Sequence, residues 1–182
     1  MAVRNRRLTI FQGFFMQKKV FQLLVDNTSG VLSRIAGLFS RRGYNIDSIT
    51  AGVTADPRYT RITIVTDGDD EILEQIEKQL EKLVDVRDIR VLEPEKSVYR
   101  ELCMIKIEAD AKARQGIISL SEVFRANIVD VAPDAVIAEI TGNQSKINAF
   151  IDLLSDYRIL EIARTGIAGL QRGTEGVIWL DP

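Results

Sequence analysis

The sequence predicts an α+β protein made of two consecutive ferredoxin-like βαββαβ domains. The spacing of apolar residues gives the order strand, helix, strand, strand, helix, strand, and the same order recurs after a plausible linker at 93–96. A length of 182 residues suits two small domains. In this fold, two split βαβ units form a four-stranded antiparallel sheet with two helices on one face.

The first half of the chain shows each element of that order. Alternating apolar residues predict a strand at 19–26, and a helical stripe that starts at Val31 is stopped by Gly43. The segment 44–53 is strand-like, but the parity of its apolar residues shifts, which predicts a bulge or burial on both faces. The predicted elements after the Asp56-Pro57 turn are a strand from Thr60 that ends at Asp67-Gly68, a helix with its stripe at 72–83 and a strand at 86–92.

The second half repeats this order while sharing little residue identity with the first. Its predicted elements are a strand at 99–109, a helix at 117–124, a hairpin of 128–131 and 135–140 around Pro133-Asp134, a helix at 147–154 and a strand at 159–163. The resulting divisions are a basic leader arm at 1–17, domains at 18–93 and 98–170, and a tail at 171–182. Domains of about 70 residues with one helix-free sheet face are marginal alone, so we expect oligomerisation or a partner that covers an open face or edge.

The composition excludes several classes of site. Histidine is absent and there is one cysteine, which rules out His-containing catalytic triads, His-ligated zinc, Cys-cluster metal sites and disulfides within the chain. Lys and Arg number 24 against 26 Asp and Glu, so a formal charge of −2 provides no positive field for nucleic acid. No apolar run approaches the roughly 20 residues of a membrane helix. These features fit a cytoplasmic protein.

The transition from the first strand to the first helix, at 26–32, is the most informative stretch. A helix start leaves about four N–H groups without internal partners and carries a partial positive charge. Gly30 lets a small anion approach that backbone, and the amide of Asn27 can both donate and accept hydrogen bonds. A capped helix, with Thr28 or Ser29 as the N-cap, needs the same residue types, and from these residues alone it is the commoner explanation.

The stretch Val25–Thr50 reads V-D-N-T-S-G-V-L-S-R-I-A-G-L-F-S-R-R-G-Y-N-I-D-S-I-T. It closely resembles the ACT domain at the start of the small, regulatory subunit of acetolactate synthase (acetohydroxyacid synthase). Further similar stretches follow in the family's order at 74–86, 100–102, 124–131 and 161–167. The resemblance covers about residues 16 to 170 and identifies the first predicted domain as an ACT domain.

The resemblance implies a regulatory subunit without catalytic residues, metal site or cofactor of its own. In that family the large catalytic subunit carries thiamine diphosphate, Mg²⁺ and FAD, and the small subunit binds and activates it. The small subunit also confers feedback inhibition by valine or a related branched-chain amino acid (leucine or isoleucine), which binds between the paired ACT domains of a homodimer. The positions that match the family's effector-binding residues are Asn27, Gly30, Val31 and Leu32 of one protomer and Asn45 and Ile46, on the second strand, of the other.

Three other functions are compatible with the predicted fold. An RNA-binding module needs stacking aromatic residues on the open sheet face, but the third strand offers Arg61, Thr63 and Val65 there. A small hydrolase needs an Arg and Asn cradle for an acyl phosphate, and no pairing for it stands out. An ACT-type amino-acid sensor that regulates another enzyme, or is joined to a DNA-binding partner, is the main alternative, although no helix-turn-helix segment is visible.

Three remaining features have simple structural explanations or stay open. Cys103 lies in an apolar strand and is expected to be a buried thiol. The acidic run 67–71 lacks the spacing of a calcium loop and is expected to be the capped start of the second helix. Trp179, in the apolar segment 177–180, is expected either to pack on an open sheet edge or to dock on a partner.

Overall fold

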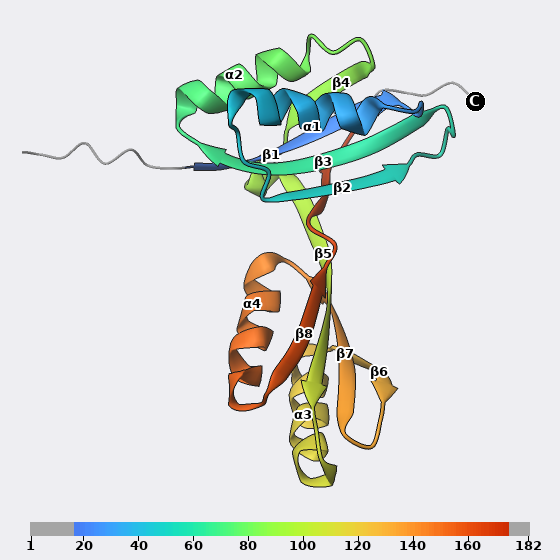
Figure 1. The fold of residues 1–182 in the computed structure, drawn as a ribbon, viewed down its shortest axis with the longest axis vertical. Coiled ribbons are helices and arrows are strands. Elements are labelled where there is room, and N and C mark those ends of the chain that lie inside the picture. The colour runs from blue at the N-terminus through green and yellow to red at the C-terminus, as the bar shows by residue number, and fades with distance from the viewer. Residues whose placement is uncertain (1–16, 175–182) are drawn as a thin grey trace, which may run out of the picture.

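The computed structural model describes residues 17–174, and its first domain has the predicted order of elements (Figure 1). These are β1 (Gln17–Asp26), α1 (Val31–Arg42), β2 (Ser48–Val53), β3 (Tyr59–Gly68), α2 (Asp70–Leu80) and β4 (Val86–Val91). The strands form an antiparallel sheet in the order β2-β3-β1-β4, so β2 and β4 are its edges. Both helices cover the same face of this sheet.

Apolar side chains between the sheet and the two helices form the core of the first domain. Phe21 of β1, Ile62 of β3, Ile35 of α1 and Ile76 of α2 are each fully buried in it. Alternation along a strand sends every second side chain to the same face, which explains the predicted pattern. Helix α1 ends at Gly43 as predicted, with a left-handed φ of 70° that an L side chain tolerates poorly.

Strand β2 begins at Ser48, whereas the apolar pattern predicted a start at Tyr44. Its pairing with β3 covers all six residues without a register shift, and its residues are exposed or half-buried, so neither the predicted bulge nor the alternative of burial on both faces is found. Tyr44 and Ile46 pack against the core from the segment before the strand, and the backbone N–H of Tyr44 donates to the carbonyl of Phe39 at 3.0 Å. Asn45 and Ile46 therefore precede β2, and the prediction that they lie on the second strand is wrong.

The second domain repeats the arrangement of the first. Its elements are β5 (Ser97–Glu108), α3 (Ala111–Phe124), β6 (Asn127–Val131), β7 (Ala135–Gly142), α4 (Gln144–Leu153) and β8 (Ile159–Arg164), with short 3-10 helices at Pro94–Lys96 and Leu154–Asp156. The strands pair in the order β6-β7-β5-β8, and Ile105, Ile117 and Phe150 are among the buried core residues. The predicted fold class, two consecutive ferredoxin-like domains, is confirmed.

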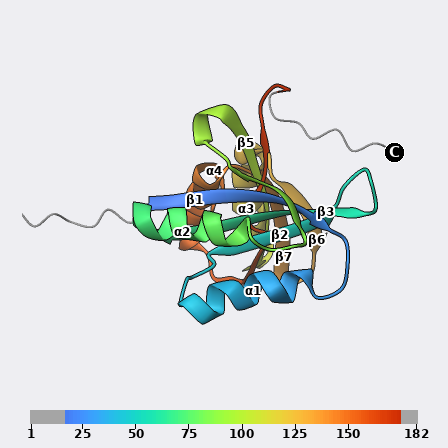
Figure 2. The same ribbon diagram turned by 90° about the horizontal axis from the view of Figure 1, so that it is seen from above.

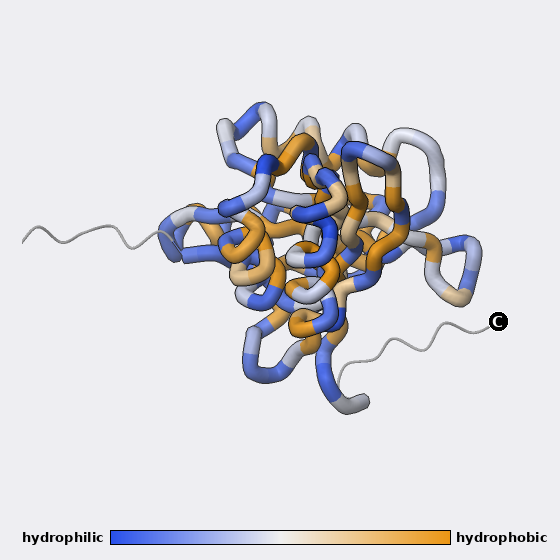
Figure 3. The backbone as a smooth tube through the Cα atoms, turned by 90° about the horizontal axis from the view of Figure 1, so that it is seen from below, coloured by the Kyte–Doolittle hydropathy of each residue, from blue (hydrophilic) through white to orange (hydrophobic). Residues whose placement is uncertain are grey.

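The two domains lie end to end along the long axis of the molecule, and β5 runs from one into the other (Figure 1). Viewed along that axis, they overlap (Figure 2). Viewed from the other end of this axis, many hydrophobic residues lie toward the middle of the molecule, whereas hydrophilic residues are frequent in the outer turns (Figure 3). Within residues 17–174, no helix is both long and apolar enough to cross a membrane.

A ninth strand, β9 (Ala168–Gln171), joins the domains and was not predicted from the sequence. It pairs with the first four residues of β5, from Ser97 to Arg100. The amide of Gln22, in β1, donates to the carbonyl of Gly169, and the Thr50 hydroxyl donates to the carbonyl of Thr165 at 3.0 Å. The β5–β9 ribbon is therefore bound to the first sheet by hydrogen bonds.

A small apolar cluster fills this junction. Val20 and Val65, on the helix-free face of the first sheet, are buried with Leu92 and Ile167, and Tyr99 packs against them. Part of the open face, which we expected a partner to cover, is thus covered by the chain itself.

Candidate effector-binding site

The start of α1 has no side-chain cap. Gly30 is the N-cap residue, with a left-handed backbone (φ 85°, ψ −8°), and no side chain bonds to the first turn. The alternative explanation from the residues alone, in which Thr28 or Ser29 serves as the N-cap, is therefore wrong. Because the first-turn N–H groups of a helix have no internal partners, those of α1 are left to solvent or to a ligand.

The other α-helices of the described chain start differently. Their N-cap side chains accept hydrogen bonds from first-turn N–H groups: Asp69 in α2, Asp110 in α3 and Asn143 in α4. Asp69 lies in the acidic run, whose expected role as a helix start is confirmed. The missing cap is therefore particular to α1 among the four α-helices of residues 17–174.

Arg34 brings a positive charge to this helix start and was not singled out from the sequence. Its Nε and Nη2 donate to the carboxylate of Asp85 at 2.6 and 2.9 Å, and these hydrogen bonds raise the pKa of Arg34. Its Nη1 lies 2.9 Å from the position that a Cβ on Gly30 would take. The signal available in the sequence was the spacing of four residues from Gly30, which places Arg34 one helical turn further on.

Asn27 holds the loop before α1 in place. Its Nδ2 donates to the carbonyl of Pro57 at 2.8 Å, and its Oδ1 accepts from the hydroxyl of Thr60 at 3.1 Å. An amide has two N–H donors and two acceptor lone pairs, so one donor and one acceptor position remain for a ligand. The neighbouring Asp26 is bound by two hydrogen bonds from Arg87, which lower the pKa of that carboxyl. Asp26 thus has a structural role, in line with its omission from the predicted site.

Val31 and Leu32 offer different groups to a ligand at the start of α1. Val31 is 4% exposed and its side chain belongs to the first core, so only its backbone N–H faces the helix start. Leu32 is 49% exposed and offers an apolar surface beside that start.

Asn45 and Ile46 lie at the opposite end of α1. The helix has 12 residues, which corresponds to about 18 Å along its axis. The amide of Asn45 donates to the carboxylate of Asp47 at 2.9 Å, and Ile46 is half-buried against the core. One chain therefore does not bring the two groups of predicted residues together.

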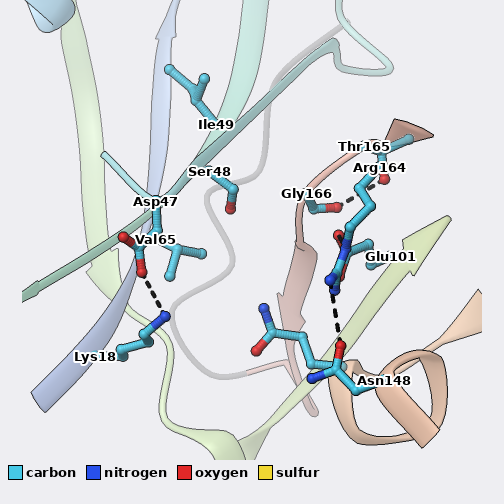
Figure 4. Close-up of a pocket in the computed structure, with 11 residues that line it drawn as sticks. Lys18, Asp47, Ser48, Ile49, Val65, Glu101, Asn148, Arg164, Thr165 and Gly166 are labelled. Carbon is cyan, nitrogen blue, oxygen red and sulfur yellow. Dashed lines mark hydrogen bonds and ion pairs between the residues drawn. The ribbon is translucent and has the colours of Figure 1, made fainter. Parts of the chain in front are cut away.

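A cleft of about 570 Å³ lies between the domains, next to Asp47 (Figure 4). On one wall Lys18 bonds to Asp47 at 2.6 Å, and on the other Arg164 bonds to the buried Glu101 through two contacts of 2.8 Å. The ion pair with Glu101 raises the pKa of Arg164. Since each acid in the cleft is neutralised by a base, the cleft has no uncompensated charge with which to select a ligand.

Two other expectations can be judged from the structure. Cys103 is fully buried, as predicted, and burial raises the pKa of its thiol, which makes it a poor nucleophile.

On β3, Arg61, Thr63 and Val65 do lie on the helix-free face, but Val65 is covered by the junction cluster. This face is therefore unsuited to stacking RNA bases. Trp179 lies outside the described residues.

Comparisons with known proteins agree in both domains. A family model of the acetohydroxyacid synthase (AHAS) small subunit-like ACT domain matches residues 21–88, and a model of the small subunit of acetolactate synthase matches residues 100–173. The acetolactate synthase isozyme 3 small subunit of Escherichia coli is 44% identical over 157 residues, which cover 86% of this chain and 96% of that protein. The acetolactate synthase small subunit of Mycobacterium bovis is 45% identical over 155 residues, 85% of this chain and 92% of that one.

A solved structure matches both domains in the same way. The crystal structure of the acetolactate synthase small subunit from Thermotoga maritima matches with a TM-score of 0.80 and 44% identity, covering 87% of this chain and 99% of that one. Because these similarities extend over both domains, the chain belongs to the family of acetolactate synthase small subunits.

Proposed function

We propose that this chain binds and activates the large subunit of acetolactate synthase and makes that enzyme subject to feedback inhibition by a branched-chain amino acid, with valine as the first candidate. The observation that carries the proposal is the uncapped start of α1, where Gly30 leaves the first-turn N–H groups without a side-chain acceptor. Such a helix start favours a carboxylate through its N–H groups and its partial positive charge.

The residues around the helix start match the remaining parts of an amino-acid ligand. The free positions on the amide of Asn27 suit the carboxylate and ammonium groups, and Nη1 of Arg34 lies beside Gly30 as a further donor for the carboxylate while Nε and Nη2 bond to Asp85. Exposed Leu32 and half-buried Ile46 provide apolar surface for a branched side chain. A ligand of about eight heavy atoms reaches micromolar to millimolar affinity, about −4 to −8 kcal/mol, without exceeding the usual efficiency ceiling.

The proposal requires a homodimer, because a single chain keeps the two groups of site residues at opposite ends of α1. Strand β2 is a sheet edge, and its Ile49, which is 39% exposed, follows Asn45 and Ile46 closely in the chain. Two copies meeting here bring the start of α1 of one chain near residues 45–46 of the other. Feedback then needs a difference of about 1 to 3 kcal/mol in effector affinity between two states of the complex.

Catalysis is assigned to the partner in this proposal. Thiamine diphosphate, Mg²⁺ and FAD are expected on the large subunit, and this chain is expected to carry no cofactor. The buried thiol of Cys103 and the absence of histidine from the sequence support a regulatory role over a catalytic one.

Substitutions at the helix start test the proposal in the reconstituted complex. Asn27→Ala and Gly30→Asp are expected to abolish inhibition of acetolactate formation by valine while the subunits still associate, as measured by sedimentation. Asn127→Ala, at an exposed position on β6, is the matched control and is expected to retain inhibition. Unchanged inhibition in both site variants would rule out this site.

A further inference from the structure

A second groove lies beside the junction, between the first sheet and the β5–β9 ribbon. It has a volume of about 450 Å³. Its first wall consists of residues 50–53 of β2 with Arg61 and Thr63 of β3, and its second wall consists of Val98, Arg100 and residues 168–170. The groove shares no residue with the proposed effector site.

The lining of this groove combines apolar side chains with two arginines. Val53 and Leu170 are 61% and 59% exposed and line the same groove, so their apolar surfaces lie together. Among the described residues that line the groove, none is acidic. Arg61 donates to the amide oxygen of Gln22 at 2.8 Å, and Arg100 donates to a backbone carbonyl at 2.6 Å. Burial and the nearby charge of Arg90 lower the pKa of Arg61. The groove therefore suits an apolar segment that also carries a carboxylate.

The sequence beyond the described residues has this composition. After Thr174 it continues Glu175-Gly176-Val177-Ile178-Trp179-Leu180-Asp181-Pro182. Four consecutive apolar residues are followed by an aspartate. The family model of the second domain ends at residue 173, so this segment lies outside the part that the model matches.

The segment starts close enough to reach the groove. Leu170 lines the groove and Thr174 follows it by four residues. Seven further residues, through Asp181, span up to about 25 Å when extended. A tether of this length gives an effective local concentration on the order of millimolar, an advantage that a segment of a separate protein lacks.

We propose that residues 177–181 bind in this groove of the same chain, with their apolar side chains against Val53, Val98 and Leu170 and the carboxylate of Asp181 near Arg100. The proposal is independent of amino-acid binding at the start of α1. It gives a role to Trp179, which the proposed regulatory function leaves unexplained.

Trp179 is the single tryptophan of the 182 residues, so its fluorescence reports on this contact directly. In the full-length chain we expect emission at a shorter wavelength, and several-fold weaker quenching by acrylamide, than in a synthetic peptide of residues 174–182. Emission and quenching equal to those of the peptide would overturn the proposal.

Substitutions in the groove identify the binding surface. Leu170→Asp is expected to shift the emission of Trp179 to the value of the peptide. Leu160→Asp, a matched change at a 46% exposed leucine on β8 outside the groove, is expected to leave the emission unchanged. Circular dichroism establishes that both variants are folded. A buried Trp179 that responds to neither variant, or to both, would place the segment elsewhere and refute the proposal.

The contact between Arg100 and Asp181 can be tested separately by reversing their charges. This test remains available if Leu170→Asp fails to fold. Arg100→Glu is expected to increase quenching of Trp179, and combining it with Asp181→Arg is expected to restore the protection. Equal quenching in the wild type and in the Arg100→Glu variant would contradict the assigned contact. A protected Trp179 that appears only after addition of the large subunit would show that the partner, and not the groove, binds the segment.

Discussion

Gly30 is the residue whose conformation most affects the proposed site. Its φ of 85° is left-handed, and a Cβ there would lie 2.9 Å from Nη1 of Arg34. We expect Gly30→Ala to lower the free energy of unfolding by about 1 to 2 kcal/mol, because an L side chain is strained in this region. Gly30→Asn is expected to cost less, since asparagine tolerates that conformation better. Urea denaturation measures both.

Gly43 provides the matched control for this prediction. Its φ is also left-handed, at 70°, but a Cβ there would meet no atom within 4 Å. Gly43→Ala should therefore cost only the backbone strain, and less than Gly30→Ala. An equal or smaller cost at Gly30 would show that the contact with Arg34 does not constrain the helix start.

The ion pair between Asp26 and Arg87 makes a prediction about pH. Hydrogen bonds of 2.7 and 2.5 Å from Arg87 lower the pKa of Asp26. A carboxyl whose folded pKa is lowered stabilises the protein above its unfolded pKa of about 3.9, and this contribution is lost as the pH falls through the folded value.

Asp26→Asn is accordingly expected to lower the free energy of unfolding at neutral pH by less than about 1 kcal/mol, because the pair is partly exposed. The difference from the wild type should vanish at acid pH in urea titrations between about pH 2 and 7. Asp130→Asn, at an exposed position on β6, is the control. A difference that persists unchanged at the lowest pH would contradict the role of the carboxylate charge.

Single residues were the least predictable part of the site. The polar stretch before α1 allowed Thr28 or Ser29 to be the N-cap, and only the backbone conformation shows that Gly30 takes this place. Val31 has the right position for a pocket residue, but its side chain faces the core. The arrangement of Arg34 over Gly30 depends on Asp85, which is 51 residues away along the chain and could not be paired with it from local sequence.

At the level of whole elements, the helix starts differ in a way that mutation can measure. The side chain of Asn143 accepts a hydrogen bond from the N–H of Lys146 at 3.0 Å and so caps α4. Asn143→Ala is expected to cost about 1 kcal/mol. Because no side chain caps α1, Thr28→Ala and Ser29→Ala are expected to change the free energy of unfolding by no more than a few tenths of a kcal/mol. A loss near 1 kcal/mol for either would mean that the start of α1 is capped in solution.

Most elements were predictable because their apolar periodicity reflects burial on one face. Helix α2 follows this rule, with Leu73, Ile76 and Leu80 buried. Strand β1 is buried on both faces from Val20 to Val25, because the domain junction adds to the burial of its helix-free face. The apolar pattern predicts a start of β2 at Tyr44, four residues too early. Tyr44 and Ile46 are apolar because they pack against the core from the loop before the strand. Strand β9 was missed because its four residues, Ala-Gly-Leu-Gln, have no pattern of their own and depend on pairing with β5.

For the molecule as a whole, the junction cluster determines whether the two domains unfold together. Ile167 is 5% exposed and packs with Val20, Val65 and Leu92. Ile167→Ala is expected to cost about 2 kcal/mol, near the lower end for such a core substitution because the cluster is small. We expect the thermal unfolding of this variant, followed by calorimetry, to broaden or split into two transitions.

Ile162→Ala is the matched control, since Ile162 is 42% exposed on β8. It is expected to cost less and to leave the shape of the transition unchanged. A single sharp transition in the Ile167→Ala variant, at the wild-type temperature, would show that the junction does not couple the domains.

The central proposal is that two copies of this chain bind a branched-chain amino acid at the uncapped start of α1 and thereby regulate the large subunit. The most direct measurement is isothermal titration calorimetry of valine, leucine and isoleucine into the assembled, active complex. We expect saturable heat from at least one of them, with a dissociation constant between micromolar and millimolar, and its loss in the Asn27→Ala complex. The absence of heat from all three amino acids in the wild-type complex would contradict the proposal.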